Sequence, residues 1–205
     1  LVATIIIFIL FKLKAFKLWT FWFFLSVWFC LAIAFNAFTS DLIAILLALL
    51  LSIYKIFKKN LLIHNLTELF LYGGLASVFV PVLNLWSASI LLILIALYDA
   101  IAVWKTKHMI TLATTQTSLK LFSGLCIPYG KNKTAILGGG DIGFTLFFTG
   151  AALKTYGYWS LVITGTLTLA LWILLAKAKK NTFYPAMPFL AAGCFLGYGL
   201  LALFA

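Results

Sequence analysis

Most of this chain consists of apolar runs about as long as a membrane is thick. Hydrophobic residues make up 65% of its 205 residues, and charged residues make up only 9%. A run of about 20 apolar residues crosses the hydrocarbon core as an α-helix, because a helix satisfies its own backbone hydrogen bonds where no water is present. The sequence therefore predicts an all-α polytopic membrane protein, and its composition excludes a water-soluble globular domain.

Eight apolar segments follow one another with mostly short connections. We expect residues 1–11 to form only a partial span, because a helix of that length rises about 16 Å. This segment lacks a small-residue cleavage site, so we interpret it as a helix cut at its start rather than as a signal peptide. The seven complete spans are predicted at residues 18–38, 41–56, 61–83, 85–104, 134–153, 157–176 and 182–205.

The lysines predict how the chain is oriented in the membrane. All 15 basic residues are lysines, and the formal net charge is +11. Fourteen of them fall on one side of the predicted spans, whereas Lys154 falls on the other. The positive-inside rule makes the lysine-rich side cytoplasmic and places the C-terminus outside. The lysines form no stripe typical of nucleic-acid binding, and the three scattered cysteines have no CxxC spacing that would predict a zinc site.

Two aspartates interrupt the apolar segments. A carboxylate in hydrocarbon costs several kcal/mol, so each is a candidate for a functional site. Asp99 lies six residues before Lys105, and Asp141 lies eight residues after Lys133. These spacings place the two carboxylates about 9 Å and about 12 Å from the cytoplasmic edge. The two helices run in opposite directions, and yet their acidic residues reach a similar depth.

Two carboxyl groups at matching depth suggest acid–base chemistry. Both cannot ionise cheaply when they face each other, so one should hold a proton. One protonated and one ionised carboxyl can polarise an amide carbonyl and activate a water molecule. Ion channels and proton-coupled transporters also use intramembrane carboxylates, so the spacing alone leaves protease and transporter open. Gly138, Gly139 and Gly140 either let a backbone approach Asp141 closely or serve helix packing.

Three short motifs resemble those of a known family. They are Tyr98-Asp99, Gly138-Gly139-Gly140-Asp141 and Pro185-Ala186-Met187. In order, helix and spacing they resemble the YD, GxGD and PAL motifs of the presenilin and signal peptide peptidase family. The similarity is expected to extend from about Asn65 to the C-terminus, and the run from Tyr98 to Met109 is similar to the archaeal branch. Met187 stands where the family has Leu, which is a volume-conserving exchange.

The resemblance implies an intramembrane aspartyl endopeptidase with a presenilin-like helical bundle. Such an enzyme hydrolyses peptide bonds within the transmembrane helices of substrate proteins, and it needs no metal or organic cofactor. Asp99 and Asp141 would be the catalytic pair. The resemblance implies that the residues that shape the site or seat the substrate are Tyr98, Gly138, Gly140, Pro185, Ala186 and Met187. The family has nine helices, so the eight segments here would correspond to its second to ninth.

The family also implies a domain organisation and an environment. Residues 1–205 would form one protease domain, with N-terminal helices in 1–83, aspartate helices and their connection in 84–153, and C-terminal helices in 154–205. The connection is shorter than the loop that presenilins cut during maturation, so we expect activity without accessory subunits. The lysine count makes this loop cytoplasmic, as in presenilins, in what would be an archaeal cell membrane. Substrate helices would then have their N-termini outside and would enter from the lipid.

Several further interpretations accompany this prediction. Residues 108–133 are too polar to span the membrane, so we expect them to form an interfacial segment. The family resemblance implies that this segment can pair with the unwound part of a substrate. A transporter stays as the alternative function. A prepilin peptidase also uses GxGD, but Tyr98 and the Pro-Ala-Met motif argue against it. His64 and Glu68 share a helix face, yet no third metal ligand is evident, so we expect a helix-packing hydrogen bond there.

Overall fold

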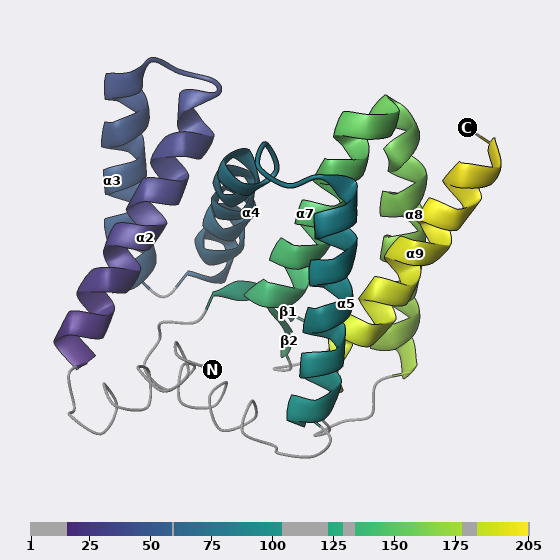
Figure 1. The fold of residues 1–205 in the computed structure, drawn as a ribbon. Helices are drawn as coiled ribbons and strands as arrows, with labels where there is room; N and C mark the ends of the chain where they lie inside the picture. The colour runs from purple at the N-terminus through teal and green to yellow at the C-terminus, as the bar shows by residue number, and fades with distance from the viewer. Residues whose placement is uncertain (1–15, 59, 104–122, 129–133, 178–183, 205) are drawn as a thin grey trace. The chain divides into compact units, whose positions relative to one another are not determined.

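A computed structural model describes residues 16–58, 60–103, 123–128, 134–177 and 184–204. The predicted partial segment 1–11 lies outside these residues. The described part is predominantly helical and divides into two compact units, Leu1–Gly74 and Leu75–Ala205. Its helices are α2 (Phe16–Asn36), α3 (Asp41–Phe57), α4 (Leu61–Phe79), α5 (Leu85–Ile101), α7 (Gly139–Tyr156), α8 (Leu161–Lys177) and α9 (Ala186–Phe204) (Figure 1).

Four helical stretches in the described residues are long and apolar enough to cross a membrane. They are Leu18–Asn36, Leu61–Phe79, Gly139–Lys177 and Ala186–Leu203. The third contains both α7 and α8, which are joined by the 3-10 turn η2 (Gly157–Ser160). Gly157 has a φ of 58°, a left-handed conformation that glycine adopts without strain. Each of the seven complete predicted spans overlaps a described α-helix, which agrees with a multi-pass helical membrane protein.

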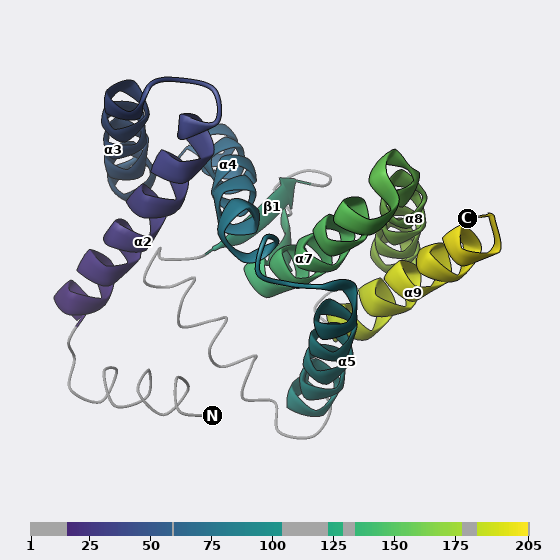
Figure 2. The ribbon, with the colours of Figure 1, turned by 45° about the horizontal axis from the view of Figure 1, so that its top comes forward.

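In the first unit, α2 and α3 lie side by side along their length (Figures 1 and 2). Small residues let these helices approach, since the buried positions of α3 include Ala44, Ala48 and Ser52 at helical spacing. Gly74 of α4 also packs closely, because a Cβ added there would lie 1.9 Å from the Cys30 carbonyl oxygen on α2. Close backbone approach at small residues therefore contributes to the packing of this unit, beside large buried side chains such as Leu31.

An ion pair is buried in the same unit. The Lys55 ammonium on α3 hydrogen-bonds the Glu68 carboxylate on α4, and their side chains are 2% and 0% exposed. Lys55 was counted above with the loop lysines, and that count is wrong for this residue, which lies in the last turn of α3. A helix-packing contact was expected at the face that His64 and Glu68 share, and at Glu68 this contact is an ion pair with Lys55 of α3.

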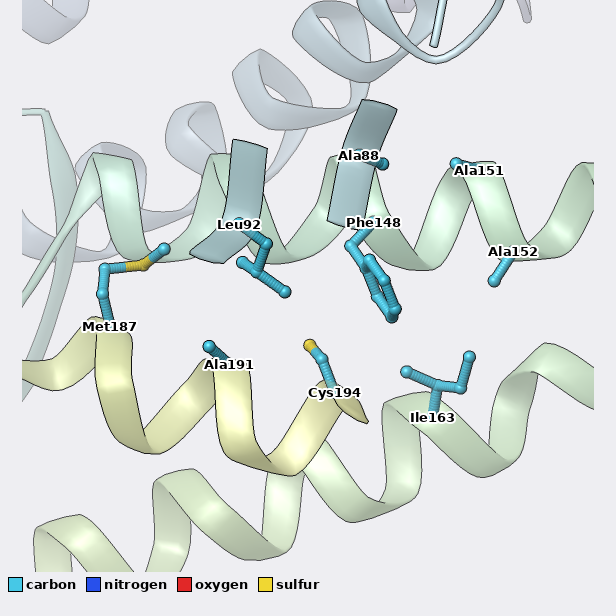
Figure 3. Packing of buried hydrophobic residues seen from close by; sticks show 9 residues of the cluster. All are labelled: Ala88, Leu92, Phe148, Ala151, Ala152, Ile163, Met187, Ala191 and Cys194. Atoms are coloured by element: carbon cyan, nitrogen blue, oxygen red, sulfur yellow. The ribbon is translucent and has the colours of Figure 1, made fainter. Parts of the chain in front are cut away.

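The core of the second unit joins four helices, α5, α7, α8 and α9. Phe148 of α7 is fully buried at its centre, with edge-to-face ring contacts to Phe195 and Tyr198 of α9. Figure 3 shows the buried cluster, in which side chains of α5, α7 and α9 converge and Ile163 of α8 closes one end. Gly197 of α9 packs against the Ile163 backbone, since an added Cβ would lie 2.6 Å from its Cα. These contacts fix α9 against its neighbours.

A β-hairpin replaces part of what the sequence predicts as a helix. Strands β1 (Gly124–Pro128) and β2 (Thr134–Gly138) pair antiparallel, with Gly124 opposite Gly138. The predicted helix start at residue 134 is therefore wrong, because α7 begins only at Gly139. Three consecutive glycines are poor helix formers, and the strand satisfies its backbone groups by pairing instead. The predicted interfacial segment 108–133 includes β1, and most of its remainder lies outside the described residues.

Two other predicted boundaries shift for reasons that involve proline. Helix α4 ends at Phe79 rather than at residue 83, because Pro81 cannot donate a helical hydrogen bond and disfavours a helical residue before it. Helix α9 begins at Ala186, directly after Pro185, whereas the prediction began at residue 182. The later start places the amides of Ala186 and Met187 in the first turn of α9, where backbone N–H groups lack intrahelical partners.

Candidate active site

Asp99 lies near the C-terminal end of α5 and is half-buried. The helix is set at its other end by a capping box, in which Asn84 and Ser87 exchange side-chain and backbone hydrogen bonds. The backbone N–H of Met187 donates to Asp99 Oδ2 at 3.2 Å. Met187 is the second residue of α9, so a free amide at the positive end of that helix is directed at the carboxylate. A segment 88 residues away in sequence thus orients the first acidic group.

Asp141 occupies the first turn of α7, where a negative charge is favoured by the helix dipole. The Gly138 amide hydrogen-bonds its carboxylate. Gly138 also keeps space for that carboxylate, because a Cβ added at Gly138 would lie 3.1 Å from Asp141 Oδ2. The strand β2 therefore delivers a glycine, with its amide, to the position that holds the second acidic group.

The two aspartates are brought together by antiparallel packing of their helices. Figures 1 and 2 show α5 and α7 side by side and running in opposite directions, with the hairpin at the end where α7 begins. The Asp99 carboxylate is close enough to act electrostatically on Asp141. Two like charges in an apolar environment favour a state in which the pair shares one proton, so one carboxyl can act as acid while the other acts as base.

The remaining predicted site residues occupy different environments. Pro185 is buried, and Ala186 is half-buried. The Met187 side chain is only 2% exposed, and it lies in the hydrophobic cluster with Leu92 and Ala191, so this residue reaches Asp99 through its backbone (Figure 3). Its amide and its side chain therefore have separate surroundings.

Tyr98 and Gly140 are the more exposed members of the predicted set. Tyr98 precedes Asp99 on α5 and is 40% exposed. Gly140 has room for a side chain, since an added Cβ would meet only the Phe144 ring, at an ordinary 3.7 Å. The steric demand for glycine therefore falls on Gly138 rather than on Gly140.

Two features of the site were not predicted from the sequence. The Met187 amide as a partner of Asp99 leaves no sequence signal, since every residue except proline carries an amide. The hairpin before Asp141 does leave one, because Leu125–Ile127 and Ala135–Leu137 are short apolar runs next to glycines. Such runs, separated by a short polar connection, are typical of a β-hairpin.

The fold and the paired carboxylates define a class of protein, a multi-pass membrane protein with an acid pair between two adjacent helices. The family model described as "Signal-peptide peptidase, presenilin aspartyl protease" matches residues 1–141, a range that contains both aspartates and ends before the Pro-Ala-Met motif. The chain belongs to this family. It is an integral membrane protein and an intramembrane aspartic endopeptidase, and its family acts on transmembrane substrates.

A solved structure shows the same fold. It is titled "Structure of a presenilin family intramembrane aspartate protease in C222 space group". The similarity covers 100% of this chain and 81% of that chain, with a TM-score of 0.72 and 21% sequence identity. No curated protein sequence matches the chain. The family predicted from the sequence is thus confirmed by the family match, and the helical architecture agrees with the solved fold.

Proposed function

We propose that Asp99 and Asp141 are the catalytic carboxylates of this protease. The observation that carries the proposal is that two antiparallel helices bring the two acidic groups within electrostatic reach of each other. Each group also has a backbone amide as a hydrogen-bond partner, from Met187 for Asp99 and from Gly138 for Asp141. A carboxylate oriented in this way retains its position as protons move, which acid–base catalysis requires.

The reaction follows from one shared proton. The ionised carboxylate accepts a proton from water as the water oxygen attacks the scissile carbonyl carbon. The protonated carboxyl donates its proton to the carbonyl oxygen, which yields a tetrahedral diol. Collapse of the diol then returns a proton to the leaving nitrogen and breaks the C–N bond. The two carboxyls titrate as a unit, so either can begin as the base.

The other predicted residues have roles around this pair. Gly138 gives the Asp141 carboxylate its space, and Gly140 leaves the first turn of α7 open on its exposed side. Tyr98, Pro185 and Ala186 seat the substrate beside the pair. A helical substrate must unwind before hydrolysis, and β1 is a strand with which an unwound segment can pair.

We further propose the cytoplasmic orientation of the lysine-rich side. Removing Lys55 from the loop lysines leaves the asymmetry intact, because Lys154 is still the single lysine predicted outside. The C-terminus then lies outside, and substrate helices enter from the lipid with their N-termini outside. Seven complete spans and one partial span form a single protease domain in an archaeal membrane, and the domain acts without accessory subunits.

The test is cleavage of a tagged transmembrane peptide by purified protein in liposomes, with cut sites mapped by mass spectrometry. Asp99→Asn and Asp141→Asn preserve side-chain size but remove the acid, and each should lower the rate at least about 10³-fold. Asp41→Asn is the matched control, because Asp41 is exposed at the start of α3. Undiminished cleavage by either variant contradicts the proposal. Ion flux through the same liposomes without peptide cleavage would favour a transporter.

A further inference from the structure

One face of α7 carries a continuous set of contacts with the end of α4 and the α4–α5 connection. A Cβ added at Gly143 would lie 3.8 Å from the Leu75 side chain, and the Phe147 and Phe79 rings are 5.1 Å apart. The next residue on this face is Gly150, where an added Cβ would lie 2.6 Å from Val80 Cγ2. The α7 residues of this set recur at intervals of four and three, so they form one stripe along the helix.

Lys154 is the last residue of this stripe. Its ammonium donates to the backbone carbonyl oxygens of Val80, Pro81 and Leu83 at 3.1, 3.0 and 3.0 Å. An ammonium group has three protons, so all three have acceptors. The acceptors lie just beyond the end of α4, where helical carbonyls lack intrahelical partners. One side chain of α7 therefore fastens the whole connection that leads into α5.

The contact lies at nearly the same distance along each helix from the aspartate that the helix carries. Asn84, which caps α5, is 15 residues from Asp99, and Lys154 is 13 residues from Asp141. At helical rise these arms measure about 22 Å and about 20 Å. The two helices are antiparallel and are held together at the Lys154 contact. Because the segments from this contact to Asp99 and to Asp141 have nearly equal lengths, the two acidic groups lie at the same level. A slip of one helix along the other would separate the carboxylates.

We propose that Lys154 is a positioning residue that sets the axial register of the two aspartate helices. By fastening the α4–α5 connection to α7, it keeps Asp99 level with Asp141, some 20 Å away along both helices. This inference rests on the proposed function, in which Asp99 and Asp141 are the catalytic carboxylates. It assigns a role in the membrane reaction to the single lysine predicted on the outer side.

The first test compares Lys154→Met with Lys154→Arg in the peptide-cleavage assay, below the unfolding temperature of each variant. Met keeps the length of the side chain but removes all three donors. It should lower kcat by about 10- to 100-fold with KM within about twofold, since a displacement of about 1 Å between reacting groups can have an effect of that size. Arg keeps the charge and N–H donors but presents them in a planar, longer side chain, so it should retain a higher kcat than Met without reaching the wild-type value.

A matched control and a second variant separate this role from a general loss of folding. Lys177→Met alters an exposed lysine in the last turn of α8 and should leave kcat unchanged. Gly150→Leu leaves Lys154 in place but displaces Val80 from the same stripe, and it should lower kcat with KM unchanged. If Lys154→Met does not fold, the Gly150 variant decides the outcome in its place.

A readout independent of catalysis distinguishes this inference from the proposed function. Asp99→Cys and Asp141→Cys are combined in full-length protein whose three native cysteines are replaced by alanine. The rate of cross-linking by a short bifunctional thiol reagent reports the register. Lys154→Met should slow that reaction at least about fivefold, as expected when effective concentration falls with misalignment, even if the wild-type protein cleaves no peptide. Unchanged cross-linking together with unchanged kcat would overturn the inference.

Discussion

Each of the two units holds a pair of ionisable side chains, fully buried in the first unit and half-buried in the second. In the first unit, Lys55 and Glu68 are opposite charges that neutralise each other. In the second unit, Asp99 and Asp141 are like charges that act on each other unfavourably. The first pair therefore contains its own counter-charge, whereas each acid of the second pair has a backbone amide as its partner. An ionisable residue in a membrane segment indicates a catalytic or transport site when its nearest charged neighbour has the same sign of charge.

The geometry of Lys55 explains why the first pair is structural. Side chains on a helix point toward its N-terminus, so the Lys55 ammonium on the last turn of α3 is directed back along the helix and away from the adjacent loop. There it meets the Glu68 carboxylate, and its Nζ lies 5.9 Å from the centre of the Phe23 ring. This arrangement links α3 to α4 through a buried ion pair.

The largest expected effect concerns removal of one partner of that pair. Lys55→Met and Glu68→Leu should each lower the free energy of unfolding by about 3–5 kcal/mol, because each leaves a buried group without its counter-charge. The double variant should be within about 1 kcal/mol of wild type, since two apolar side chains can replace a buried ion pair. The free energies of unfolding of wild type, the two single variants and the double variant are measured in mixed detergent, with circular dichroism as the signal.

Activity measurements on the same variants test the comparison itself. The double variant should cleave peptide at the wild-type rate, because neither residue belongs to the proposed reaction. A folded double variant without activity would show that Glu68 takes part in chemistry, and the distinction between the two pairs would then fail.

The pH dependence should also differ between the two pairs. Cleavage should follow a bell-shaped profile, because at low pH both aspartates are protonated and no base exists, whereas at high pH both are ionised and no acid exists. Each limb should change about tenfold per pH unit, as expected for loss of one required protonation state. Measured kcat/KM for wild type and for the Lys55→Met/Glu68→Leu double variant should give the same curve. A flat profile from acidic to neutral pH would count against a carboxyl pair.

Much of the helical architecture could be predicted from the sequence, because apolar length is a strong and local signal. Helix α3 was expected at residues 41–56 and lies at Asp41–Phe57. The errors lie where tertiary pairing overrides composition. Residues 134–138 are apolar enough to continue a span, but they pair with β1, and nothing in their own composition specifies that partner.

The site shows the same division between local and distant information. Asp99 and Asp141 are predicted because each is a local anomaly in an apolar run. The depth predicted for Asp141 is wrong in its assumption of helical rise from Lys133, because residues 134–138 form β2 and α7 begins only at Gly139. The Lys55–Glu68 pair was missed because it depends on how two helices face each other. The contact between the Met187 amide and Asp99 was missed because it spans 88 residues and involves no distinctive side chain.

Substitution of two glycines in the same motif tests which of them leaves space for the Asp141 carboxylate. Gly138→Ala places a Cβ 3.1 Å from Asp141 Oδ2, so the carboxylate must shift by a few tenths of an ångström. It should lower kcat about tenfold, as small displacements of a catalytic group do. Gly140→Ala meets the Phe144 ring at ordinary distance in a helical turn, so it should keep kcat within about twofold and add about 0.5–1 kcal/mol of stability. The reverse ranking would mean that substrate, rather than Asp141, requires the missing side chain.

The smallest expected effect is at Met187, which contributes to both the core and the site. Its side chain packs in the cluster with Leu92 and Ala191, while its amide donates to Asp99. Met187→Leu conserves volume and leaves the amide in place, so it should change the free energy of unfolding by less than about 1.5 kcal/mol. Cleavage rate and cut sites should stay as in wild type. A shifted cut site with unchanged stability would show instead that this side chain reaches the substrate, and the separation between its amide and its buried side chain would no longer hold.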